Sequence, residues 1–182
     1  MKTILLENVI PEKELFFLYT ELIKSSVWCV NAKSTDVEYQ SNKNFLHGPQ
    51  LVVKLPDQIL NYGLYMLGQT IIYRIEHILK DKNIGIHTKM FRMWFNITYS
   101  GEETQHWLHT DITEKNRQTI VLFMTPVWKN DWNGNFYVDG EKFLFKPGSA
   151  VIFDSKEFHT GESPSSKTFN WQRLTCNIVT EE

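Results

Sequence analysis

The hydrophobic pattern of this chain changes its period near residue 86. Before that point, apolar residues recur with helical spacing over 11–25, where Pro11 marks a helix start, and over 56–82. After it, short β-type runs alternate with turn residues, and these runs cover 89–99, 119–124, 136–138, 142–145, 150–153 and 173–179. Helices followed by many strands favour an α+β domain in which the helices pack on one sheet of a β-sandwich.

Turn residues and length set the expected organisation. Asp139-Gly140 lies between two β-type runs and predicts a hairpin, and Pro147-Gly148 predicts a second turn. A chain of 182 residues fits one domain, 1–182, with a helical support region over 1–85 and a β-rich core over 86–182. The polar stretch 30–50 is expected to form a loop or weak strands along a sheet edge.

Composition excludes several classes of protein. Apolar residues make up 42% and charged residues 22%, which is typical of a folded globular chain. The two cysteines, Cys29 and Cys176, are too few for a disulfide framework, and no apolar run is long enough for a membrane span or a secretion signal. We therefore expect a cytoplasmic protein without a membrane partner. A net charge of −2 argues against a nucleic-acid partner, and nothing in the sequence indicates the oligomeric state.

Three residues in the β-rich half form a candidate metal site. His109 and Asp111 are two positions apart, so on an extended segment their side chains point to the same side. His159 follows on a later strand and would supply a third ligand. Two histidines and one carboxylate with open positions form the facial triad of non-haem Fe(II) oxygenases.

Each of these residues also has a structural interpretation. A His-x-Asp pair is common by chance, and His109 would then cap a turn while Asp111 stays solvated. His106, close to His109, raises the question of zinc, but cysteines with the spacing of a structural zinc site are missing. Surface positions are expected for the other histidines, which are His47, His77 and His87.

The last β-type run carries a basic residue on a polar face. Alternation puts Arg173, Thr175 and Asn177 on one face, and the opposite face is apolar with Leu174, Cys176 and Ile178. An arginine fork with a hydroxyl two residues further on can bind a carboxylate through charge-assisted hydrogen bonds. The alternative is a surface salt bridge, which is the commoner role of arginine.

Several short motifs of the β-rich half occur in the order and spacing of a known family. They are Tyr99-x-Gly101, His109-x-Asp111, Thr119 to Trp128, Asn133-Gly134 to Val138, Phe145 to Phe153, His159 and Arg173-x-Thr175. Over residues 90–180 the sequence resembles the 2-oxoglutarate and Fe(II)-dependent oxygenases, particularly their prolyl-hydroxylase-like branch. This resemblance implies a double-stranded β-helix, that is, a cupin-like jelly roll, with supporting N-terminal helices.

The resemblance also implies roles for individual residues. His109, Asp111 and His159 would bind Fe(II), and Arg173, helped by Thr175, would bind the distal carboxylate of 2-oxoglutarate. Tyr99 would contact the same cosubstrate, although it is equally expected as a core aromatic. With O₂, such an enzyme decarboxylates 2-oxoglutarate and hydroxylates a C–H bond of its substrate.

Three departures from the family pattern concern the cosubstrate. Asn133-Gly134 stands where Gly-Gly is usual, and Phe123-Met124-Thr125 replaces Tyr-Leu-Asn, so one hydroxyl is absent. The gap from His159 to Arg173 is longer than usual, which leaves Lys167 as a reserve for carboxylate binding.

The substrate is the least constrained part of the prediction. A prolyl or other protein side chain and a free amino acid both suit the scaffold, so we expect a protein, peptide or small-molecule substrate. The alternatives are a nucleic-acid demethylase of the same superfamily and a jelly-roll binding module or isomerase that is no oxygenase. Trp107 and Trp132 are expected either at the site entrance or in the core. Arg92, Trp94 and Asn96 alternate on one strand as a row that would face the substrate.

Overall fold

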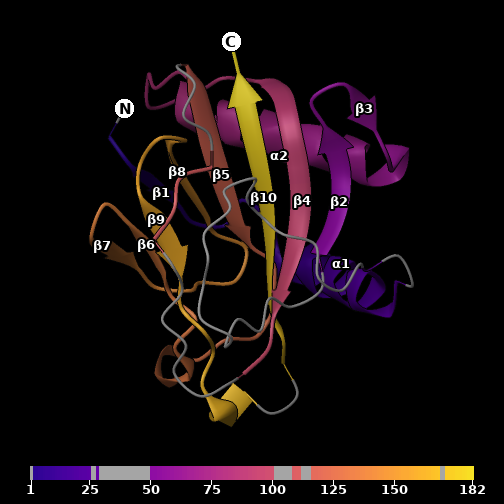
Figure 1. Cartoon of the computed structure of the whole chain (residues 1–182), viewed down its shortest axis with the longest axis vertical. Coiled ribbons are helices and arrows are strands. Elements are labelled where there is room, and N and C mark those ends of the chain that lie inside the picture. Colours follow the sequence, from indigo (N-terminus) through magenta and orange to yellow (C-terminus); the bar gives the residue numbers. More distant parts are fainter. Residues whose placement is uncertain (1, 26–27, 29–49, 101–107, 112–115, 169–170) are drawn as a thin grey trace.

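The structure is a computed structural model that describes residues 2–25, 28, 50–100, 108–111, 116–168 and 171–182. Within these ranges the chain forms two α-helices and ten β-strands in two antiparallel sheets (Figure 1). The large sheet has the order β1 (Ile4–Leu6), β8 (Ala150–Asp154), β5 (Arg117–Phe123), β10 (Arg173–Glu181), β4 (Lys89–Thr98), β2 (Gln50–Leu55) and β3 (Gln58–Ile59). The small sheet has the order β7 (Glu141–Phe143), β6 (Phe136–Val138) and β9 (His159–Gly161).

Both helices lie behind the large sheet in Figure 1. Helix α1 (Glu12–Lys24) begins after Pro11, which confirms the helix predicted over 11–25. Helix α2 (Tyr62–Lys80) begins later than predicted, because the side chain of Asn61 caps it by accepting a hydrogen bond from the Leu64 amide at 3.0 Å.

The prediction that residues 56–61 belong to the second helix was wrong. The chain turns at Pro56-Asp57, and the residues on either side form the hairpin β2–β3, whose longer strand pairs with β4. Proline fixes the backbone for a turn and disfavours the helix interior, so the apolar residues before Asn61 enter the sheet. Residues 1–85, expected to be helical support, therefore also contribute β1, β2 and β3 to the large sheet.

Two hydrophobic clusters hold these layers together. The first lies between the helices and the large sheet, and strand alternation supplies it with Leu174, Cys176 and Ile178 from β10, as predicted. The second lies between the two sheets and is built mainly from aromatic and β-branched side chains, which are Val121, Phe123, Phe136, Val138, Phe143, Phe145, Val151 and Phe153. The predicted fold class is confirmed, since the architecture is a jelly-roll double-stranded β-helix with N-terminal helices.

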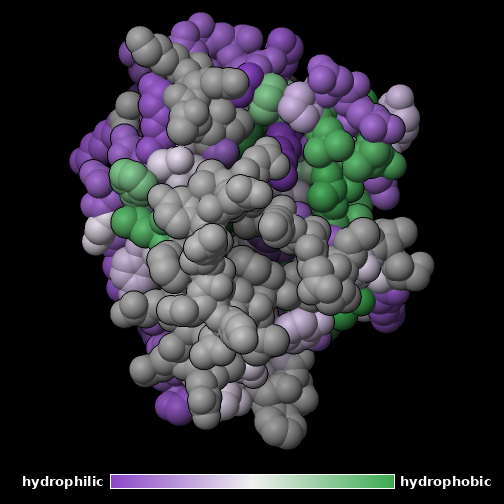
Figure 2. All heavy atoms as spheres, viewed as in Figure 1, coloured by the Kyte–Doolittle hydropathy of each residue, from purple (hydrophilic) through white to green (hydrophobic). Residues whose placement is uncertain are grey.

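Several large apolar side chains are exposed at the surface. In the part of the chain that the structure describes, neither helix is long and apolar enough to cross a membrane. Figure 2 shows apolar side chains gathered over β2 and β3, where Leu55 and Leu60 are 37% and 48% exposed.

Candidate metal centre

The two histidines of the predicted site are joined by their backbones. His109 lies in a short segment beside β9, and its amide donates to the carbonyl of His159 at 3.0 Å. The amide of His159 donates back to the carbonyl of His109 at 2.9 Å. This bridge brings the two imidazole rings to a centroid distance of 4.4 Å, although they come from segments far apart in the sequence.

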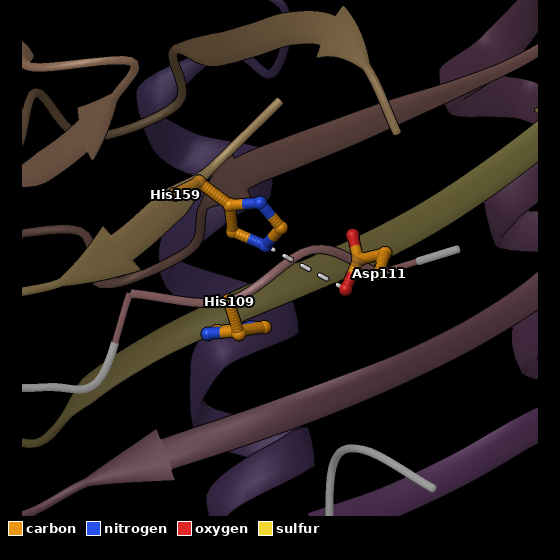
Figure 3. A group of neighbouring side chains, drawn as sticks. All are labelled: His109, Asp111 and His159. Carbon is orange, nitrogen blue, oxygen red and sulfur yellow. Dashed lines mark ion pairs between the residues drawn. The ribbon is translucent and has the colours of Figure 1, made fainter. Parts of the chain in front are cut away.

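Asp111 completes the cluster. Nε2 of His159 lies 3.6 Å from Oδ1 of Asp111, and Figure 3 shows these two side chains pointing toward one another in front of β10. One ligand atom from each of His109, Asp111 and His159 lies within 4.8 Å of the others. The structure thus brings together the three residues expected as ligands, and two of their side chains, His159 and Asp111, are only 4% and 7% exposed.

Neighbouring groups orient two of these side chains. Nδ1 of His159 lies 3.0 Å from the carbonyl oxygen of Glu157, so Nδ1 carries the proton and Nε2 is left for a metal. The hydroxyl of Thr119 donates to Oδ2 of Asp111 at 2.8 Å. Since that hydroxyl has one hydrogen, Ser155, 2.9 Å away, donates to Thr119.

Thr119 was missed as a site residue by the sequence analysis. It lies at the start of a buried β-type run. The sequence pattern there does not show whether a threonine hydroxyl bonds the backbone or another side chain. The only available signal is a polar residue at an inward position of β5, which has 0% exposure.

The charges of the cluster are coupled. Burial raises the pKa of Asp111, but the charges of His159 and His109 and the Thr119 hydrogen bond lower it, and the net pKa is below its ordinary value. Burial lowers the pKa of His159, but Asp111 and the Glu157 carbonyl raise it, and the net pKa is above its ordinary value. Asp111 is therefore ionised at neutral pH, and two imidazoles and one carboxylate suit a divalent metal that accepts nitrogen and oxygen ligands.

A buried arginine that forms no ion pair with any described acidic residue lies near this cluster. Arg173 begins β10, is 4% exposed, and donates from Nε to the carbonyl of Gly134 at 2.7 Å. Its Nη2 atom is buried and has no hydrogen-bond partner in the part of the chain that the structure describes. Burial lowers the pKa of Arg173 to about 10, although the charge of Glu162 raises it. The surface salt bridge considered for this arginine is therefore absent among the described residues.

Two glycines make room for the Arg173 side chain. A Cβ atom on Gly161 would lie 3.1 Å from Nη2 of Arg173, and one on Gly134 would lie 3.2 Å from Cδ of Arg173 and 2.6 Å from the Trp128 ring. Gly134 also has a positive φ of 74°, which glycine adopts without strain. Gly161 was missed by the sequence analysis, although it lies two residues after His159 on the same face of an extended strand.

The structure separates the other predicted cosubstrate residues. Thr175 is 2% exposed and shares the inward face of β10 with Arg173, and its Oγ1 accepts a hydrogen bond from Asn177 at 3.3 Å. Tyr99 lies just beyond the end of β4 and is 41% exposed, so its predicted role remains a prediction. Lys167 pairs with Asp131 at the surface at 3.3 Å, which leaves Arg173 as the buried cation of the site.

Of the two positions considered for Trp132, the structure shows the one in the core. Trp132 is 8% exposed and packs edge-on against Trp128 at a ring distance of 5.6 Å. Trp107, His106 and His47 lie outside the described residues. His77 stacks on Tyr73 of α2, and His87 lies near Glu182, both away from the cluster.

No protein-family model and no curated protein sequence matches this chain. Solved structures with the same fold include 2-oxoglutarate-dependent enzymes. A prolyl-4-hydroxylase of Pseudomonas putida has a TM-score of 0.61 and 14% identity, covering 99% of this chain and 92% of its own. The viral collagen prolyl hydroxylase of Paramecium bursaria Chlorella virus-1, solved with 2-oxoglutarate, has a TM-score of 0.63 and 11% identity, covering 100% and 97%.

The similarity extends beyond hydroxylases. SnoN, a non-haem α-ketoglutarate-dependent epimerase of nogalamycin biosynthesis, has a TM-score of 0.69 and 10% identity over 99% of this chain and 76% of its own. At such identities the shared feature is the fold.

Proposed function

We propose that this protein is an Fe(II)- and 2-oxoglutarate-dependent oxygenase that hydroxylates a C–H bond. The observation that carries the proposal is a two-histidine, one-carboxylate cluster on the same sheet face as an unpaired buried arginine. Val179 of β10 pairs with Thr119, the residue that binds Asp111, and Arg173 lies on the same inward face of β10. An anion-binding group and a metal-ligand set therefore share one side of the jelly roll.

The residues present fit both groups. His109, Asp111 and His159 would hold Fe(II), because Nε2 of His159 and Oδ1 of Asp111 lie close together and neither is taken by the hydrogen bonds that orient these side chains. Arg173 would hold the distal carboxylate of 2-oxoglutarate through Nη2, which has no other partner. Thr175 would offer its hydroxyl two residues further along β10.

When bound together, Fe(II), 2-oxoglutarate and O₂ would supply an oxidant strong enough for an unactivated C–H bond, with succinate and CO₂ as products. The chain's own contribution is orientation and exclusion of water. The Glu157 carbonyl orients His159, and the Thr119 hydroxyl orients Asp111. Phe136 and Phe153 pack against the His159 ring at centroid distances of 5.7 and 4.8 Å. A dry, oriented site protects a reactive oxidant from side reactions.

For the substrate, we infer a protein, peptide or amino-acid side chain of the prolyl type. The support is the fold shared with the bacterial and viral prolyl hydroxylases and the order of motifs along the chain. An epimerase with the same fold shows why the reaction needs its own assay.

The test is turnover of 2-oxoglutarate to succinate by purified protein supplied with Fe(II), ascorbate and O₂. We expect slow turnover without substrate, abolished in His109→Ala and Asp111→Ala. His77→Ala is the matched control because His77 stacks on Tyr73 at the surface of α2, and it should turn over 2-oxoglutarate like the wild type. Absence of turnover together with absence of Mn(II) binding in the wild type would refute the proposal.

A further inference from the structure

A second arginine on the inward face of the large sheet has no acidic partner within the described ranges of the chain. Arg92 of β4 is only partly exposed, and its Nε atom is buried without a hydrogen-bond partner. Its guanidinium carbon lies 4.7 Å from the centre of the Trp94 ring, two residues further along the same face. Stacking on an aromatic ring orients the fork of an arginine and leaves its edge free for an anion.

Nearby acids in the described part of the chain are already engaged. Glu181 pairs with Lys89 at 2.7 Å and with Arg117 at 3.3 Å. Asp111 is held by Thr119 and faces His159. Among the residues that the structure describes, none therefore compensates the positive charge of Arg92 on this face.

The neighbouring polar groups satisfy one another. In the amide orientation that matches its neighbours, the side-chain oxygen of Asn96 accepts from the Trp94 indole at 3.1 Å and from the Asn177 amide at 3.2 Å, and the amide groups of Asn96 and Gln50 are 2.9 Å apart. This network holds Trp94 in place beneath Arg92. Of Arg92, Trp94 and Asn96, Arg92 is therefore the residue with a buried polar atom that lacks a hydrogen-bond partner among the described residues.

Sheet register places Arg92 beside the metal cluster. Val179 pairs with Arg92 on one side and with Thr119 on the other, so one residue separates Arg92 from the threonine that binds Asp111. Two strand spacings put the Arg92 and Thr119 backbones about 10 Å apart. If the anionic end of a molecule binds Arg92, an atom a few bonds from that end would lie beside the metal.

Arg92 and Arg173 cannot share one small dicarboxylate. Arg173 pairs with Thr98, at the opposite end of β4 from Arg92. On β10, Arg173 and Val179, the residue that pairs with Arg92, are about 20 Å apart at the usual rise per strand residue. An anion at Arg92 must therefore belong to a different molecule from the one held at Arg173.

We propose that Arg92 binds an anionic oxygen group of the substrate, a carboxylate or a phosphate, beside the metal. This inference rests on the proposed function, because it treats the molecule beside the metal as the substrate. Trp94 orients the guanidinium, and Val179 lies between Arg92 and Thr119 in the sheet.

The indole N–H signal of Trp94 gives a direct test in ¹⁵N-labelled protein, assigned through its loss in Trp94→Phe. Sodium acetate and sodium phosphate are the probes, titrated at constant ionic strength against sodium chloride. We expect a saturable shift with at least one probe, and tighter binding of acetate or of phosphate identifies the group. Arg92→Gln should weaken this binding at least tenfold and Arg92→Lys less, whereas Arg74→Gln, at an arginine paired with Glu14 between the helices, should behave like the wild type.

Two results would overturn the inference. One is a Trp94 signal that neither anion moves in the wild type, and the other is an equal response in Arg92→Gln. These failures are separable from failure of the proposed function, which is read from 2-oxoglutarate turnover by the wild type. Turnover without an anion response rejects Arg92 alone, whereas absence of both turnover and Mn(II) binding in the wild type rejects the oxygenase.

Discussion

Arg173 and Gly134 are joined by a hydrogen bond of 2.7 Å from Nε to the carbonyl oxygen. This bond fixes the plane of a buried guanidinium while Nη2 remains without a partner. Burial of this charge is costly, the charge of Glu162 offsets part of the cost, and an arriving carboxylate reduces it further. The arginine is thereby oriented before its anion binds.

Replacing this arginine separates cosubstrate binding from metal binding. In Arg173→Met we expect the concentration of 2-oxoglutarate for half-maximal turnover to rise about 10- to 150-fold, from the loss of about 1.5–3 kcal/mol of charge-assisted hydrogen bonding. Mn(II) affinity should stay unchanged. Thermal unfolding with and without 2-oxoglutarate should show that the cosubstrate stabilises the wild type and not the variant. Arg74→Met is the control, and an unchanged 2-oxoglutarate requirement in Arg173→Met would move the role to another residue.

Gly161 offers a smaller change at the same place. In Gly161→Ala the new methyl carbon would lie about 3.1 Å from Nη2 of Arg173. We expect a several-fold weaker interaction with 2-oxoglutarate, measured by calorimetry with Mn(II) present, and a folded protein. Gly85→Ala is the matched control because a Cβ there meets nothing within 4 Å. Equal affinity in the two variants would contradict the expected crowding.

Thr119 is predicted to tune the metal without touching it. Thr119→Val keeps the shape of the side chain but removes the hydrogen bond to Asp111. Loss of such an outer partner typically weakens metal binding about 10- to 100-fold, and we expect a loss in this range for Mn(II), measured by electron paramagnetic resonance. Thr180→Val makes the same change at another fully buried threonine, which contacts the Gln118 carbonyl, and should leave Mn(II) affinity unaltered.

Metal binding should depend on pH. The pKa of His159 is raised and that of Asp111 is lowered, so in the metal-free protein their ion pair stabilises the fold between these two values. That contribution is lost as pH rises through the pKa of His159 and as it falls through the pKa of Asp111. A metal must displace the proton of His159, so Mn(II) affinity should increase with pH by up to about tenfold per unit until that pKa is passed. Titrations on both sides of the ordinary histidine pKa of about 6.5 measure this, and a flat profile would contradict it.

The sequence predicted the residues whose chemistry is carried by their type and spacing. His109 and Asp111 converge because alternate residues of an extended chain share a side, and the same rule placed Arg173 and Thr175 on the inward face of β10. His159 required a tertiary assumption, namely that a later strand returns beside the first two ligands.

Other features depend on contacts that no local pattern encodes. The strand β2 lies between the polar stretch 30–50 and the helical pattern over 56–82, and pairing with β4 decides its conformation. Trp132 carries the same local signal whether it lines an entrance or packs in the core, and its tertiary contact with Trp128 decides between the two. Gly161 and Thr119 gain their roles from neighbours that are distant in sequence.

The backbone bridge between His109 and His159 ties the folding of the chain to the metal. In the unfolded chain these two residues are the ends of a long loop whose closure costs entropy. A cation held by both side chains spans the same loop that the bridge closes, so it binds the folded chain far better than the unfolded one. The cation therefore stabilises the folded state in proportion to its supply. The amount of folded protein in a cell should rise and fall with available metal.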